Sequence, residues 1–413
     1  MTRTYTFRDS EVRALPLRAL NWAGARFART RPVLDADRIC AAARSAAGRD
    51  DLGGDSYREP LERYVEALNA EAELTTFGRF ATRQMLVKSL ATRARLHAYE
   101  AQHPEVRSER LTAPWVIVGL PRTGTTLLSY LLGLDPMARA PLHWEADDPA
   151  PPPTLATAAE DPRIATSAAQ YAQLVRMNPC IQAMHPFGAT LAQECVAFFM
   201  YDLRTLGMET QAYVPSYGRW LRDCDMAPAY AQHQRALRVL QSTQPTERWV
   251  LKTPNHLWCL PTLFETYPDA RVLWTHRHPG RVVTSLASLV NALQRTFSTR
   301  RDPLPVAEEW REKAHCAIER GMAFDRTRED GWCCHVRYGD LTADPIATVR
   351  RIYAHFGDSP SPLHERRMAA WMRDRPQETF GRHAYDPGDF GWSYDQLDAE
   401  FAAYREAFDV GRE

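Results

Sequence analysis

The stretch from Pro114 to Leu132 reads PWVIVGLPRTGTTLLSYLL, and the rest of the chain can be interpreted around it. Its beginning, Trp115 to Leu120, is a short apolar run with β-branched residues and predicts a buried strand. A glycine-containing loop follows, and Leu127 to Leu132 predicts an apolar helix. A strand, such a loop and a helix N-terminus form a cradle for phosphate, because backbone N–H groups and the helix dipole favour an anion there.

The loop keeps the glycine spacing of nucleotide-binding P-loops but changes their charged residue. Four residues separate Gly119 from Gly124, as in a Walker loop. Thr125 and Thr126 stand where a Walker loop carries lysine followed by serine or threonine, and the cation of this loop is Arg122. We therefore expect a phosphate site that is not built like that of an ATPase or GTPase.

The composition is that of a globular protein. The 413 residues are 45% hydrophobic and 25% charged, which suits one large domain or two ordinary ones. The formal net charge is zero, which excludes a general field that would attract nucleic acid or an anionic membrane. No run approaches the roughly 18 apolar residues of a membrane span, and we expect no signal peptide because the N-terminus lacks an apolar core.

The eight cysteines are scattered and include no C-x-x-C pair. In a chain of this length they predict free thiols in a reduced cytoplasm rather than a disulfide framework. Cys333, Cys334 and His335 are adjacent, but neighbours in a strand point to opposite faces and no second ligand pair follows. We therefore expect no zinc site there.

Two later blocks repeat the pattern of a strand, a basic residue and a helix. RWVLKTPNHLWCL predicts a strand that ends at Lys252 and a helix that starts near His256. ARVLWTHRHPGRVVTSLASL predicts a strand followed by Arg277 and a helix that carries Ser285. Lysine is rare in this chain, so Lys252 indicates a need for a compact point charge.

Together these blocks resemble the sulfotransferases that use 3′-phosphoadenosine 5′-phosphosulfate (PAPS). The PRTGTT loop is similar to the family's 5′-phosphosulfate loop. The resemblance implies that Lys252 acts on the leaving phosphate and that the loop residues bind the 5′ group, namely Arg122, Thr123, Gly124, Thr125 and Thr126.

The resemblance also implies residues for the rest of the donor. Arg277 and Ser285 fit the family's 3′-phosphate element, in which a serine follows eight residues after the arginine. The segment CHVRYGDL, from Cys334 to Leu341, predicts another strand, and it resembles a family unit that would bring Tyr338 towards the adenine. A glycine followed by basic residues resembles the segment that closes over the 3′-phosphate, which makes Arg382 and His383 candidates.

Three residues compete for the role of the catalytic base. His256 is the first choice because histidine titrates near neutral pH, although the family's histidine comes two residues after the lysine, where Pro254 stands here. Glu145 resembles the base of Golgi-type sulfotransferases. Glu194 begins an apolar helical stretch, where a carboxylate is costly unless it is paired or functional.

Strands that alternate with helices predict an α/β fold of the P-loop type, in three layers, with a central parallel sheet flanked by helices. Residues 1–110 contain no strand-like run and predict a helical N-terminal cap or the face of a homodimer. A sulfotransferase domain is expected over 111–413, with a helical acceptor lid over 150–245. Aromatic residues in Tyr213 to Trp220 favour a hydrophobic small molecule or a lipid as acceptor.

The implied reaction moves a sulfuryl group from PAPS to a hydroxyl or amine, with catalysis by positioning and electrostatics. We expect no metal, because the strands end in Lys252 and Arg277 rather than in the acidic residue that places Mg²⁺. Two alternatives stay open: a P-loop kinase or NTPase acting on a small molecule, and a non-catalytic nucleotide-binding protein.

Overall fold

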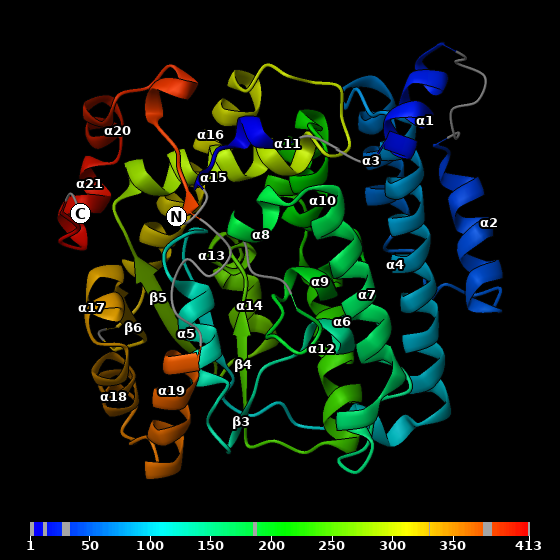
Figure 1. Cartoon of the computed structure of the whole chain (residues 1–413). Coiled ribbons are helices and arrows are strands. Elements are labelled where there is room, and N and C mark those ends of the chain that lie inside the picture. The colour runs from blue at the N-terminus through cyan, green and yellow to red at the C-terminus, as the bar shows by residue number, and fades with distance from the viewer. Residues whose placement is uncertain are drawn as a thin grey trace.

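The computed structural model describes residues 4–10, 15–26, 34–184, 188–329, 331–374 and 382–411 (Figure 1). At its centre lies a five-stranded sheet in the order β3-β4-β2-β5-β6, in which every neighbouring pair is parallel. This confirms the predicted α/β fold with a parallel sheet. The strands are β2 (Trp115–Val118), β3 (Ala138–Arg139), β4 (Arg248–Lys252), β5 (Arg271–His276) and β6 (Cys333–Arg337).

Both faces of the sheet are covered, because successive side chains of a strand point to opposite faces. Trp115 and Ile117 belong to one hydrophobic cluster, and Val116 and Val118 belong to another. The first cluster includes residues of α5 (Thr125–Leu132), α17 (Tyr338–Ala343), α18 (Pro345–His355) and α19 (Pro362–Asp374). The second includes residues of α12 (Ala227–Thr243), α13 (Asn255–Trp258), α14 (Leu260–Thr266) and α16 (Leu304–Asp325).

The remaining elements surround this three-layer core. The chain between β3 and β4 is helical, and before α12 it forms α6 (His143–Asp147), η4 (Ala158–Glu160), α7 (Pro162–Met177), α8 (Cys180–Met184), α9 (Val196–Phe199), α10 (Leu206–Gln211) and α11 (Pro215–Asp223). Helix α15 (Pro279–Gln294) follows β5, and the C-terminal part contains β7 (Arg382–His383), η5 (Pro387–Phe390), α20 (Tyr394–Glu400) and α21 (Ala402–Ala407). None of the helices in the described ranges is long and apolar enough to cross a membrane.

The N-terminal part is mainly helical. Its elements are β1 (Thr4–Tyr5), η1 (Phe7–Asp9), α1 (Leu15–Arg26), α2 (Ala36–Ala47), α3 (Arg58–Ala70), α4 (Thr76–Gln102) and η3 (Pro104–Ser108). The long helix α4 begins where the Thr75 side chain accepts a hydrogen bond from the Gly78 N–H at 2.9 Å, and it ends just before Pro104. Leu61 and Leu90 share one buried cluster with Leu237 of α12, so these helices pack on the same core as the sheet.

Two local predictions are wrong. The strand expected to reach Leu341 ends at Arg337, because its neighbour β5 ends at His276, opposite Arg337, and offers no further backbone partners. The N-terminal region does contain a strand, β1, which pairs in parallel with β7. Two residues are too short to leave a sequence pattern, and the partner strand lies at the other end of the chain.

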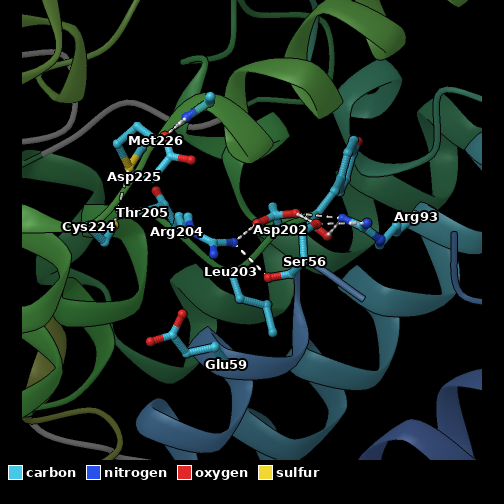
Figure 2. A network of polar contacts seen from close by, with 12 residues as sticks. Ser56, Glu59, Arg93, Asp202, Leu203, Arg204, Thr205, Cys224, Asp225 and Met226 are labelled. Atoms are coloured by element: carbon cyan, nitrogen blue, oxygen red, sulfur yellow. Dashed lines mark hydrogen bonds and ion pairs between the residues drawn. The ribbon is translucent and has the colours of Figure 1, made fainter. Parts of the chain in front are cut away.

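A buried ionic network joins the N-terminal helices to the segment between β3 and β4 (Figure 2). Arg93 of α4 pairs with Asp202 at 2.7 Å and also donates to the Leu52 carbonyl at 2.9 Å. Arg204 and the Ser56 hydroxyl bond to the same carboxylate, whose side chain has no solvent exposure. The carboxylate of Asp202 is therefore the ion-pair partner of two buried arginines, Arg93 and Arg204.

We expect Asp202→Ala to lower the free energy of unfolding by about 3–5 kcal/mol, because Arg93 and Arg204 would remain buried without their carboxylate. Urea denaturation followed by circular dichroism measures this change. The control is Asp223→Ala, which removes an exposed ion pair with Arg320 and should cost below about 1 kcal/mol. Equal effects of the two substitutions would contradict the role assigned to the network.

Candidate active site

The loop between β2 and α5 has a backbone that only glycine tolerates at two positions. Gly119 has a φ of 138° and Gly124 a φ of 88°. A Cβ atom would lie 2.5 Å from the Thr275 hydroxyl at Gly119, and 3.0 Å from the Tyr338 ring at Gly124. Arg122 also has a positive φ, 71°. The loop therefore folds tightly against β5 and α17 and turns into the first turn of α5, whose N–H groups are free of intrahelical partners.

The threonines of the loop have different environments. Thr123 is buried under the loop, where its hydroxyl donates to the Leu120 carbonyl at 2.7 Å and lies 2.6 Å from the Thr275 hydroxyl. Thr125 and Thr126, in the first turn of α5, line a cavity in front of the loop. Thr123 thus holds the loop, while the other two are accessible to a ligand.

Basic residues gather around the loop. Arg122 donates to the Ser285 hydroxyl at 3.2 Å and to the Met184 carbonyl at 2.7 Å. Arg277 donates to the Arg122 carbonyl at 3.0 Å, and its guanidinium lies 4.0 Å from the centre of the Tyr338 ring. Burial lowers the pKa of Arg122, and the charge of Arg277 adds to this effect. A bound anion would relieve the repulsion between the two guanidinium groups.

The C-terminal strand β7 reaches the same region. The Ser288 hydroxyl, on the same helix α15 as Ser285, lies 2.8 Å from Nε2 of His383. Burial, with a further contribution from the charge of Arg122, lowers the pKa of His383 to about 3, so its imidazole is neutral at physiological pH. Arg382 is exposed on the same short strand.

A lysine–carboxylate pair lies at the end of β4. Nζ of Lys252 is 2.6 Å from Oε1 of Glu194 and 3.4 Å from the Thr126 hydroxyl. The backbone holds the two segments together, since the Cys195 N–H donates to the Lys252 carbonyl at 2.8 Å. The pair thus stands directly beside the phosphate loop.

The phosphate loop, the first turn of α5, Glu194 and Arg277 open on one cavity of about 600 Å³. At one end the lining includes Arg122, Thr126, Glu194 and Arg277. The rest of the wall is largely apolar and comes from α7, α8, α10, α15 and their neighbours: Leu174, Ile181, Leu206, Leu286, Leu289, Val290, Leu293, Phe297 and Trp310. The cavity can therefore hold an anionic group next to a hydrophobic molecule.

Two of the three proposed bases do not line this cavity. His256 has no exposed surface, its Nδ1 lies 2.7 Å from the Tyr230 hydroxyl, and burial lowers its pKa well below the usual value. Glu145 forms an ion pair with Arg139, accepts the Leu142 N–H at 3.0 Å and lines a different cavity of about 790 Å³. Glu194 is the candidate that faces the phosphate loop.

Three polar residues next to Glu194 were not predicted from the sequence: His143, Tyr171 and Gln193. Nδ1 of His143 lies 2.6 Å from the Tyr171 hydroxyl and 3.0 Å from the Gln193 side-chain nitrogen. Gln193 also accepts the Glu194 N–H at 2.7 Å, and all four residues line the cavity. The only sequence signal for His143 was its position two residues before Glu145, which was itself a candidate. The sequence of such a segment does not show whether His143 or Glu145 points into the cavity.

Comparisons with known proteins agree with this arrangement. A model of the sulfotransferase family matches residues 114–359. Omega-hydroxy-beta-dihydromenaquinone-9 sulfotransferase Stf3 of Mycobacterium bovis is 25% identical over 266 residues, which cover 63% of this chain and 67% of that protein.

Two solved structures share the fold over nearly the whole chain. Sulfotransferase STF9 from Mycobacterium avium superposes with a TM-score of 0.84 at 30% identity and covers 91% of this chain and 97% of its own. Sulfotransferase STF1 from Mycobacterium tuberculosis superposes with a TM-score of 0.81 at 32% identity, over 90% and 99%. With a family match over more than half of its length and these two structural relatives, the chain belongs to the sulfotransferase family, and it is an enzyme that transfers a sulfuryl group.

Proposed function

We propose that this enzyme transfers the sulfuryl group of PAPS to a hydroxyl of a hydrophobic, lipid-like acceptor. The observation that carries the proposal is the single cavity that joins the basic phosphate loop to a chamber with apolar walls. The loop end suits a charged donor, and the chamber suits an acceptor whose body is apolar. A Mg²⁺-dependent kinase fits less well, because the strand ends beside the loop carry Lys252 and Arg277 rather than a metal-binding acid.

A second group of basic and hydroxyl side chains lies beside the phosphate loop. This group favours PAPS over a donor that lacks a 3′-phosphate. Arg277 and Ser285 lie beside the loop, where they can bind the 3′-phosphate. Ser288, on the same helix as Ser285, contacts His383, and Arg382 precedes His383 in the chain. The Arg277 guanidinium lies over one face of the Tyr338 ring. The aromatic ring of Tyr338 can contact the adenine of the donor. Thr125, Thr126 and the N–H groups of the loop receive the 5′-phosphosulfate.

The acceptor proposal rests on the chamber and on one relative. Side chains from α15, including Leu286, Leu289 and Leu293, form one wall of the chamber. Stf3 is named for a hydroxylated menaquinone derivative, a hydrophobic molecule with a hydroxyl. A hydroxyl at the end of an apolar molecule can reach Glu194 while the apolar part fills the chamber.

The location in a reduced cytoplasm and the homodimeric state stay predictions from the sequence.

Glu194 is our choice for the base. Its carboxylate takes the proton of the acceptor hydroxyl, the oxygen attacks sulfur, and the bond between sulfur and the bridging phosphate oxygen breaks. Lys252, at 2.6 Å from Glu194, and Arg122 stabilise the negative charge that develops on the leaving phosphate. Gln193 holds the backbone of Glu194 in place, and His143 extends this polar wall towards the acceptor.

His256 is less suited to the same role. Its ring is fully buried behind the cavity, and burial favours the neutral form without giving it a path to the acceptor. Glu145 is occupied by Arg139 and faces another cavity. The proposal therefore reverses the order of bases that the sequence suggested.

The function is tested with ³⁵S-labelled PAPS in buffer that contains EDTA, using lipid and water-soluble extracts as acceptors. We expect label to move into an organic-phase product, because the chamber is apolar and the proposed chemistry needs no metal. Thin-layer chromatography and mass spectrometry identify the product. Transfer only to protein or polysaccharide would contradict the acceptor class, and Mg²⁺-dependent turnover of ATP without sulfuryl transfer would contradict the function.

We expect Arg277→Ala to weaken PAPS binding about tenfold to a hundredfold, the scale of a lost charge-assisted hydrogen bond. Adenosine 5′-phosphosulfate, which lacks the 3′-phosphate, should lose far less affinity. Isothermal titration calorimetry measures both ligands. Arg281→Ala is the control: this arginine lies in the first turn of α15, four residues after Arg277, but its guanidinium lies over the Tyr394 ring, and both affinities should stay unchanged. Equal losses for the two ligands in the Arg277 variant would show that this arginine does not bind the 3′-phosphate.

We expect Glu194→Gln to lower kcat by about 10²–10⁴, the usual effect of losing a general base, with little change in PAPS affinity. Glu145→Gln and His256→Gln should cost less, because neither side chain lines the cavity. Initial rates at saturating PAPS and acceptor measure the three variants. An inactive His256 variant that still folds, beside an active Glu194 variant, would return the role of base to the histidine.

A further inference from the structure

Three side chains with metal-binding atoms meet behind the lysine–carboxylate pair. Cys195 immediately precedes α9, His233 lies on α12 and His256 lies on α13. Their potential ligand atoms all lie within 4.8 Å of one another, and none of the three residues has exposed surface. Three separate elements thus direct one sulfur and two imidazoles to the same buried point.

Both imidazoles are oriented by tyrosines. The Tyr267 hydroxyl lies 2.7 Å from Nδ1 of His233, and the Tyr230 hydroxyl lies 2.7 Å from Nδ1 of His256. The opposite nitrogen, Nε2, is buried in each ring and has no hydrogen-bond partner among the described residues. A buried polar atom without a partner costs about 1–3 kcal/mol, and native proteins rarely retain one, so two in one cluster point to a ligand.

We propose that Cys195, His233 and His256 form a binding site for one Cu(I) ion. Metal–nitrogen bonds of about 2.0–2.1 Å and a metal–sulfur bond of about 2.3 Å in a trigonal plane separate the donors by about 3.5–4 Å, which the 4.8 Å limit accommodates. On binding, the thiol of Cys195 releases its proton to solvent and the thiolate sulfur bonds to copper. The copper stays Cu(I), so no redox partner is needed.

Charge and ligand number select this ion. One thiolate and two neutral imidazoles neutralise a monovalent cation, and three donors complete a trigonal Cu(I) site. Zn²⁺ would leave one positive charge in the interior and would lack the fourth ligand of its usual tetrahedron. The surroundings are aromatic, since the Phe199 ring contacts both histidine rings at 5.5 and 5.7 Å between centroids.

The site lies next to the catalytic pair without entering the cavity. Cys195 directly follows Glu194, and its N–H bonds to the Lys252 carbonyl at 2.8 Å. His256 directly follows Asn255, which lines the cavity. A bound ion would therefore join the chain segments that carry Glu194 and Lys252, and its role would be to hold them, separate from the metal-free sulfuryl transfer proposed above.

The test reconstitutes the purified enzyme with Cu(I) under anaerobic, reducing conditions, with Zn²⁺ in a parallel sample. We expect one tightly held copper ion per chain and an upward shift of Tm on loading. X-ray absorption at the copper edge should show two imidazole nitrogens and one sulfur. This spectroscopic result uses the wild-type protein and does not depend on any variant folding.

Variants separate this site from the other thiols. Cys195→Ala should lose the ion, while Cys40→Ala, which removes an equally buried thiol on α2, should keep it. Tyr267→Phe should weaken copper binding about 10–100-fold, the usual cost of removing a group that orients a ligand. The absence of tight copper binding, copper bound by several sulfurs, copper retained by the Cys195 variant, or a preference for Zn²⁺ would each overturn the assignment.

Discussion

The pairing of β2 between β4 and β5 is the constraint on which the site depends. The parallel register sets Ile117 opposite Lys252 and Val118 opposite Trp274. Parallel strands bring their carboxyl ends to one edge of the sheet, where α/β proteins bind their ligands. The phosphate loop, Lys252 and Arg277 meet there although they are far apart in the sequence. A shift of one residue in this register would turn the side chains to the opposite faces of the sheet.

The cavity has a basic end at the phosphate loop and an apolar part beyond it, and Glu194 lines the cavity beside the loop. On one side are the loop and its arginines, and on the other are apolar side chains of α15 and of the helices between β3 and β4. The segment between β3 and β4 is not held by the sheet alone, because the buried contact between Arg93 and Asp202 joins it to α4 (Figure 2). The N-terminal helices thus support the wall of a cavity that they do not line themselves.

Local patterns were sufficient for the central fold. The strands at Trp115 and Trp249 were predicted close to their observed bounds, and a helix was predicted around Ser285, although α15 extends beyond the predicted end to Gln294. Each is a short apolar run or a periodic helix bounded by glycine or proline, and such signals do not require knowledge of distant partners. Strand β1 could not be predicted in this way, because its two residues form a strand only by pairing with β7.

Local sequence patterns were enough to predict that a glycine loop, a lysine and an arginine follow three strands, and a parallel sheet then brings them together. Which acid or imidazole faces the loop depends on the packing of distant elements and could not be predicted from these patterns. Helical spacing near a lysine suggested His256, but α12 and α13 enclose that ring against Tyr230, while the chain before α9 turns Glu194 to Lys252. The direction of a side chain in a loop or a short helix depends on packing between elements, and packing is not a local property of the sequence.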